Sequence, residues 1–315
     1  MPAARGLFHK AICMSGSAQW TLGTEEDHRR RIADKFARKL GFKSSSEMTI
    51  EKARQLSAET LRQAHMQSAD FLESGTLNVD GKTAPQDPLD MMYAGFAKDV
   101  KVMSGVTRDE GVFSAAIARQ GCSIDDVIEN VKNHFASTCY LMTGDVDCLQ
   151  NTAEDARREI ATEMVRSYQD LAARFADSTS EARARCVNLG NRKFPAVADE
   201  NYELAVKILG DHDFLLPHIM AVWELSQHSP VHAYVFSEES VPGKTVAGHG
   251  ADTKYLWGSP PTLGDGIEGP ARLSAQIMEA WASFARSGNP STPTLGTWSP
   301  ISFPKVESGT ALPAV

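Results

Sequence analysis

Short apolar runs alternate along the chain with longer stretches in which apolar residues recur every three or four positions. The short runs have the length and composition of buried strands and lie at residues 11–14, 100–106 and 231–236. The longer stretches predict amphipathic helices. These helices are expected at about 25–40, from 50, at 88–96, 123–136, 152–175, 200–210, 213–226 and 271–286. Strands separated by helices are typical of an α/β fold.

The clearest helical pattern lies near the end of the chain. Its apolar residues share one face, and these are Leu273, Ile277, Trp281 and Phe284. By contrast, the three helices expected between 120 and 210 are rich in charge. We interpret those three as cap or lid helices that lie outside the sheet.

Composition excludes several classes of partner. The 315 residues are 42% hydrophobic and carry a net charge of −8, which argues against a nucleic-acid or anionic-membrane surface. No apolar stretch approaches the length of a membrane span. The chain is therefore expected not to bind nucleic acid and not to cross a membrane. Its oligomeric state stays open.

Cysteine and histidine usage says little about redox or metal chemistry. Five cysteines show no paired spacing, and Cys139 with Cys148 could form either a disulfide or two free thiols. Nine scattered histidines form no cluster with cysteine, so neither a metal nor another cofactor is expected. The odd cysteine number and the lack of an N-glycosylation acceptor lean toward an intracellular protein, and a secreted or ER-lumenal origin stays open.

Two loops carry candidate catalytic chemistry. His249 stands between two glycines after the third apolar run, and Glu110 follows the second run within Asp109-Glu110-Gly111. A histidine that activates a serine needs an acid to orient it, and sheet-based hydrolases supply these residues in the order serine, acid, histidine. Each loop alone also has a plain structural interpretation, because acids are common where a helix starts.

Segments spread over nearly the whole chain resemble the type-B carboxylesterases, the family that includes cholinesterases and liver-type esterases. The matching segments, in chain order, are Gly6–Ile12 with Ser15–Ser17, Val79–Gly81 with Pro85 and Pro88, Gly105–Gly111, Gly210-Asp211 with Phe214 and Pro217, Tyr234 with Phe236, and Trp281, Phe284, Gly288–Pro290, Trp298 and Pro300. Each match is weak alone, and their common order makes the set specific.

The resemblance implies a partial α/β-hydrolase fold, in which residues 1–315 form the carboxyl-terminal part of the sheet with its cap helices. It implies that Glu110 is the triad acid and His249 the general base. Ser15 resembles a family serine that hydrogen-bonds near this pair, and a hydroxyl that satisfies a strand-end turn explains it equally well. Asp252 stands where the family more often has glutamate, which affects loop anchoring. The substrate of the full-length parent would be a small carboxylic ester.

The chain departs from the family pattern at its front. No Gly-x-Ser-x-Gly elbow occurs in the 315 residues, and the family's elbow would lie upstream of Gly6. We therefore expect a truncated esterase that lacks its nucleophile and oxyanion loop and is inactive alone. The alternatives are a non-catalytic esterase-like binding or adhesion protein and a partial gene product. The presence of both Glu110 and His249 favours an esterase parent.

Overall fold

The computed structural model describes residues 2–16, 21–24, 29–68, 77–112, 114–115, 121–138, 154–176, 200–238, 247–260 and 269–303. The question of a Cys139–Cys148 disulfide lies outside these ranges. Cys13 is a free thiol. Among the helices of these ranges, none combines the length and the apolar character that crossing a membrane requires.

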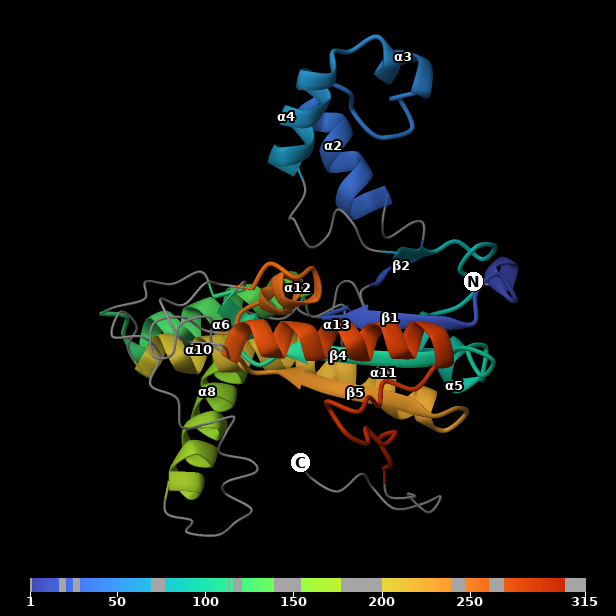
Figure 1. Ribbon diagram of the computed structural model, residues 1–315. Helices are drawn as coiled ribbons and strands as arrows, with labels where there is room; N and C mark the ends of the chain where they lie inside the picture. The colour runs from blue at the N-terminus through green and yellow to red at the C-terminus, as the bar shows by residue number, and fades with distance from the viewer. Residues whose placement is uncertain are drawn as a thin grey trace.

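A three-stranded parallel sheet forms the centre of the molecule (Figure 1). Its strands are β1 (Lys10–Met14), β4 (Lys101–Thr107) and β5 (Val231–Phe236), in the order β1-β4-β5. All three predicted strands are confirmed to within one residue. The middle strand β4 is buried over six of its seven residues, as expected for a strand covered on both faces.

Helices cover the two faces of the sheet. On one face, Met103 packs in a cluster with Ile277, Trp281 and Phe284 of α13 (Gly269–Ser287). On the other, the neighbouring Val102 packs with residues of α11 (Leu216–Ser226), which contacts the short helix α5 (Pro88–Tyr93). Adjacent residues of a strand point to opposite faces, so this division follows from the strand geometry. The result is the three-layer α/β arrangement that the sequence pattern predicts.

The three charge-rich helices gather near the carboxyl ends of the strands (Figure 1). They are α6 (Ile124–Thr138), α8 (Glu154–Ala176) and α10 (Glu200–Gly210), close to the predicted ranges. Their buried faces form a cluster of their own, made of Val127, Ile128, Val131, Ala161, Val165, Ala205, Ile208 and Leu209. The charged side chains lie outside this apolar cluster, and most of them are exposed or half-buried. That these helices serve as a cap stays a prediction.

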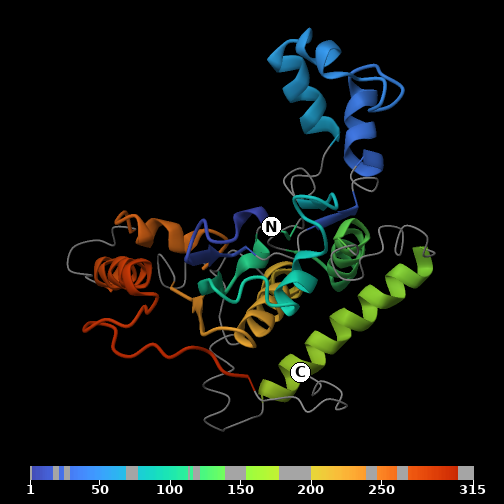
Figure 2. The same ribbon diagram turned by 90° about the vertical axis from the view of Figure 1, so that its right-hand side faces the viewer.

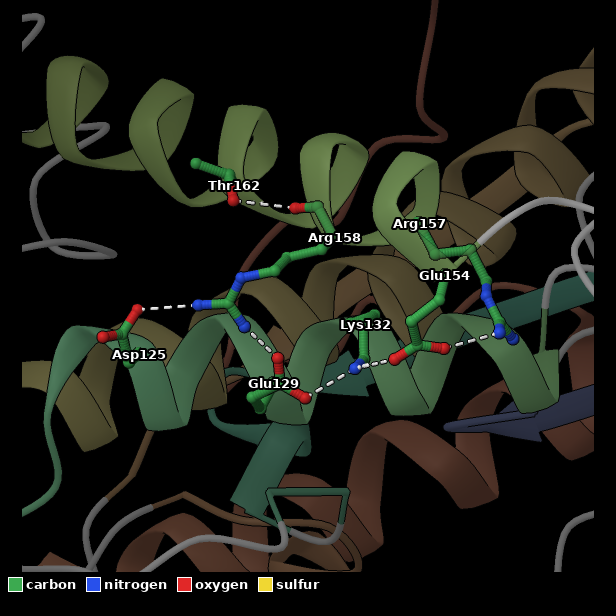
Figure 3. Close-up of polar contacts among 7 residues, drawn as sticks. All are labelled: Asp125, Glu129, Lys132, Glu154, Arg157, Arg158 and Thr162. Carbon is green, nitrogen blue, oxygen red and sulfur yellow. Dashed lines mark hydrogen bonds and ion pairs between the residues drawn. The ribbon is translucent and has the colours of Figure 1, made fainter.

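An alternating row of charges joins α6 to α8 (Figure 3). Arg158 of α8 pairs with both Asp125 and Glu129 of α6. Lys132 of α6 then pairs with Glu129 and with Glu154 of α8. The row explains how two helices with many charged residues can lie side by side: each charge faces one of opposite sign.

Between β1 and β4, the helices expected at about 25–40 and from 50 are more divided than the sequence pattern indicates. A π-helical turn at Arg29–Ala33 precedes α2 (Asp34–Lys39), and two separate helices, α3 (Ile50–Arg54) and α4 (Ala58–Ser68), replace the second. The hydroxyl of Ser57 accepts the Thr60 N–H, so Ser57 caps a new helix instead of continuing the old one. In both ribbon views, α2, α3 and α4 stand apart from the sheet (Figures 1 and 2).

Three elements were absent from the prediction. Strands β2 (Thr21–Thr24) and β3 (Leu77–Val79) form a parallel two-stranded sheet, and α12 (Ala251–Leu256) follows the histidine loop. The predicted helix at 213–226 also begins with a π-helical segment, η4 (Asp211–Leu215), that continues directly from α10. Pro217 lacks the N–H that an α-helix would direct at residue 213, which explains irregular winding just before it.

Candidate active site

The Glu110 carboxylate is the buried centre of the site. Glu110 opens a 3-10 turn, η3 (Glu110–Val112), three residues beyond the end of β4, and is 2% exposed. Its Oε1 accepts the Thr107 N–H at 2.6 Å and the Ser15 hydroxyl at 2.5 Å. Its Oε2 lies 2.7 Å from Nδ1 of His249. Three donors therefore surround one carboxylate, which is how a buried charge is tolerated.

Glycine is required beside this carboxylate because α10 packs directly against the turn. A Cβ on Gly111 would lie 1.8 Å from the carbonyl oxygen of Val206 and 2.6 Å from the amide nitrogen of Gly210. Gly210 itself has the Gly111 amide 2.8 Å from its ideal Cβ position. The two glycines thus let backbone meet backbone, and they fix the position of Glu110.

Asp109 brings the histidine loop to the end of β4. Residues 109 and 248 form a parallel bridge, in which the Asp109 N–H donates to the Ala247 carbonyl at 2.9 Å. The Asp109 carboxylate accepts the Ala247 N–H in return, at 2.8 Å. Arg108 pairs with the same carboxylate. In the sequence Asp109 is only one member of the Asp-Glu-Gly motif, whereas in the structure it anchors the loop that carries His249.

The His249 imidazole is partly open to solvent, with 39% of its side chain exposed. Its ring lies 5.1 Å from that of Phe214, at an angle of 42°. The hydrogen bond to Glu110 raises the pKa of His249 above its ordinary value, although partial burial opposes this. A neutral ring that donates Nδ1–H to the carboxylate carries its lone pair on Nε2, the arrangement of a general base.

Ser15 contacts the acid, and its backbone is unusual. It follows β1 with φ at 57°, the left-handed region that non-glycine residues seldom adopt. Its N–H donates to the Gly105 carbonyl at 2.8 Å, while its hydroxyl proton is directed at Glu110. The two expectations for Ser15, a contact near the acid and a satisfied strand-end turn, thus describe the same geometry.

Two further buried groups flank the pair. Asp252, in the first turn of α12, accepts the Tyr234 hydroxyl at 3.1 Å, and burial raises its pKa. This contact joins α12 to β5, in agreement with the expected anchoring role. His218 of α11 lies 3.1 Å from the Ser104 hydroxyl, and burial lowers its pKa to about 4, against the opposing charge of Glu110. No motif in the sequence points to His218.

The fold also gathers a group that the sequence analysis missed. His134 of α6 and the pair His212-Asp213 of η4 meet in space, although 79 residues separate His134 from Asp213. The scattered histidines of the sequence predict neither a metal nor a cofactor. The adjacent His212-Asp213 pair was the only local signal, and nothing in the sequence pointed from it to His134.

A parallel sheet covered by helices on both faces, with a carboxylate and a histidine brought together at its strand ends, is the architecture of an α/β-hydrolase. A solved structure of PNB esterase has the same fold, with a TM-score of 0.60 at 23% identity over 93% of this chain. Residues 1–311 match the model of the carboxylesterase family, and the chain belongs to that family. The resemblance noted in the sequence is thereby confirmed, as is the α/β-hydrolase fold.

The similar proteins include one named as a hydrolase and one named as a neuroligin. The chain is 26% identical to the medium-chain fatty acyl-CoA hydrolase precursor of Anas platyrhynchos, covering 94% of this chain and 48% of that protein. It is 25% identical to neuroligin-2 of Rattus norvegicus, covering 92% of this chain and 32% of the relative. The chain thus spans about half the length of the hydrolase, and it spans 52% of the PNB esterase chain.

Proposed function

We propose that this chain supplies the acid and the base of a carboxylic-ester hydrolase. Glu110 is the orienting acid and His249 the general base. The observation that carries the proposal is the 2.7 Å contact between Nδ1 of His249 and a carboxylate that is 2% exposed. A buried carboxylate on Nδ1 selects the tautomer that a serine esterase needs and stabilises the imidazolium formed in the transition state.

In this mechanism His249 removes the proton from a serine hydroxyl as the serine attacks the ester carbonyl. The protonated ring then donates that proton to the departing alcohol, leaving an acyl-serine. In the second half of the cycle His249 activates a water molecule, which releases the acid. The Glu110 carboxylate orients the ring and stabilises the positive charge that forms on it.

The nucleophile in this proposal lies outside these 315 residues. None of them stands in a Gly-x-Ser-x-Gly elbow. Ser15 is a poor substitute because its hydroxyl donates to Glu110, the residue that would have to orient its base. We therefore propose that the chain alone is inactive toward esters. Loss of nucleophile and oxyanion donors costs on the order of 10⁶ in rate, by analogy with serine-protease deletions.

The helical layer at the strand ends fits a cap over the substrate site. Helices α6, α8 and α10 pack on one another and, through α10, on the Glu110 turn. Phe214, which follows α10 and touches the His249 ring, would form part of the pocket wall. The ligand in this proposal is a small carboxylic ester.

A second candidate is a non-catalytic esterase-like protein, and the similarity to neuroligin-2 is the observation that favours it. Such a protein has no need of an acid–base pair. The intact Glu110–His249 contact therefore favours the hydrolase.

Hydrolysis of p-nitrophenyl esters tests the proposal. The 315-residue chain alone should show no turnover above that of its His249→Gln variant. If the 315-residue chain alone hydrolysed these esters and a fluorophosphonate serine probe abolished that activity, the nucleophile would lie within the chain and the proposal would be wrong. If the genomic sequence upstream of Met1 encodes an in-frame glycine-rich loop and elbow, the longer protein should hydrolyse these esters. If the longer protein contained the elbow but showed no hydrolysis that depends on His249, the non-catalytic esterase-like protein would be the better candidate.

A further inference from the structure

A second set of reactive groups converges between α6 and η4, and it includes neither Glu110 nor His249. Nε2 of His134 lies 2.8 Å from Oδ1 of Asp213, and Nδ1 of His212 lies 2.8 Å from the same oxygen. The donor atoms of the three residues all lie within 4.8 Å of one another. Two imidazoles and one carboxylate are a donor set that suits a divalent transition metal.

All three side chains are withdrawn from solvent. Asp213 is 0% exposed at its side chain, and His212 and His134 are 6% and 11% exposed. Ser114 donates to Oδ2 of Asp213 at 2.5 Å, which leaves Oδ1 directed at the two imidazoles. Carboxylates that bind metals in proteins are usually held in place by a hydrogen bond from a neighbouring residue. Ser114 holds Asp213 in this way.

The local backbone supports a specialised role for this cluster. His212 and Asp213 belong to the π-helical segment η4. Such turns are rare in proteins as a whole, and those that occur often lie at functional sites. Consecutive residues of an α-helix project about 100° apart. Here Nδ1 of His212 nevertheless reaches the carboxylate of its neighbour, and both side chains face His134 of another helix.

We propose that His134, His212 and Asp213 bind one divalent ion of the zinc type. Around Zn²⁺, nitrogen and oxygen ligands at about 2.0–2.1 Å lie roughly 3.3 Å apart in a tetrahedron. The two 2.8 Å separations from Asp213 would therefore each open by about half an ångström to admit the ion, and the imidazole nitrogens, which lie within 4.8 Å of each other, would adopt the same spacing. Three protein ligands leave a fourth position for water or another small ligand. The ion joins α6 to η4, the segment that also carries Phe214.

Zinc titration of the 315-residue chain tests this site. Chain stripped with EDTA is titrated with Zn²⁺ against a chromophoric chelator, and separately with Co²⁺ while the visible absorption is recorded. One equivalent should bind, and the midpoint of thermal unfolding should rise by roughly 5 °C or more at a hundredfold excess over Kd. The Co²⁺ form should show the visible absorption bands of a site with nitrogen and oxygen ligands.

Variants identify the ligands. His134→Gln and Asp213→Asn should each weaken Zn²⁺ binding by more than about 100-fold, and Ser114→Ala by roughly 10- to 100-fold, because Ser114 only orients the carboxylate. His9→Gln, which removes an exposed histidine outside the cluster, should leave the affinity unchanged.

The proposal fails if the wild-type chain binds no Zn²⁺ or gives no Co²⁺ absorption bands. It also fails if His134→Gln and Asp213→Asn bind as tightly as His9→Gln. Should those two variants fail to fold, an unchanged affinity in Ser114→Ala would equally overturn it. The site requires no esterase activity, so its outcome is independent of the function proposed above.

Discussion

Ser15 and Glu110 share a 2.5 Å hydrogen bond in which the serine hydroxyl donates to Oε1 of the buried carboxylate. The other oxygen of the same carboxylate contacts Nδ1 of His249. One acid therefore ties the end of β1 to the histidine loop through its two oxygens. This relationship makes the acid a structural junction as well as a candidate catalytic group.

Removing the Ser15 hydroxyl should destabilise the chain. Ser15→Ala leaves the buried carboxylate with one donor fewer, which should lower the free energy of unfolding by about 1–3 kcal/mol. Ser15→Gly loses the same hydrogen bond but suits the φ of 57°, so it should be less destabilising than Ser15→Ala by roughly 1 kcal/mol. Urea unfolding of both variants measures the difference. Equal stability of the two variants would show that the left-handed backbone carries no strain.

The Glu110–His249 contact should make stability depend on pH. Because the hydrogen bond to Glu110 raises the pKa of His249, the folded state holds the proton more tightly than the unfolded chain, whose histidine titrates near 6.5. The added stability is fully present below that unfolded value and is lost as the pH rises through the folded pKa. The unfolding free energy of wild type minus that of His249→Gln should therefore be larger at pH 5.5 than at pH 9.

The control for this pH effect is His9→Gln, which removes an exposed histidine outside the site. That variant should show no comparable change with pH. A difference for His249→Gln that stays constant from pH 5.5 to 9 would contradict a raised pKa.

The three strands of the main sheet could be predicted because their signals are local, whereas the roles of Glu110 and His249 rest on the family resemblance. The apolar run of β4 fixes a buried strand, and the motif directly after it places an acid at the strand end. The short strands β2 and β3 gave no usable pattern, since four and three residues are too few to show an alternation.

The rest of the site depends on contacts between distant residues. Asp109 anchors the histidine loop through Ala247, a contact across 138 positions that neither residue signals alone. The His134–Asp213 contact is similar. Gly111 was read as part of a motif, whereas its requirement comes from the backbone of α10, which the sequence does not place. Local spacing predicts elements, and packing decides which side chains meet.

Gly111→Ala should be severely destabilising. Its Cβ would lie 1.8 Å from the Val206 carbonyl oxygen, and both sides of the contact are backbone that cannot rotate away. We expect a loss of at least about 3 kcal/mol, at the upper end of overpacking costs. Gly269→Ala is the matched control, because no atom of the residues that the structure describes lies within 4 Å of the Cβ position there. Chemical unfolding of both variants provides the comparison, and near-equal stability would mean that α10 does not press on the Glu110 turn.

The charge row between α6 and α8 should contribute unequally along its length (Figure 3). Lys132 is 9% exposed and pairs with both Glu129 and Glu154, so Lys132→Ala leaves two carboxylates facing each other. We expect it to lower the unfolding free energy by about 1–2 kcal/mol, since the lysine is largely withdrawn from water.

Arg166→Ala serves as the control for Lys132→Ala, because the Arg166–Glu163 pair is 63% and 67% exposed. An exposed pair of this kind contributes about 0–1 kcal/mol, and salt screens it. The measurement is urea unfolding at 0.05 and 0.5 M NaCl. Lys132→Ala should lower the unfolding free energy at both salt concentrations. Arg166→Ala should have a small effect at 0.05 M and none at 0.5 M. If the two variants proved equally mild, the row would be a solvated surface feature, and the apolar cluster beneath it would alone hold α6 against α8.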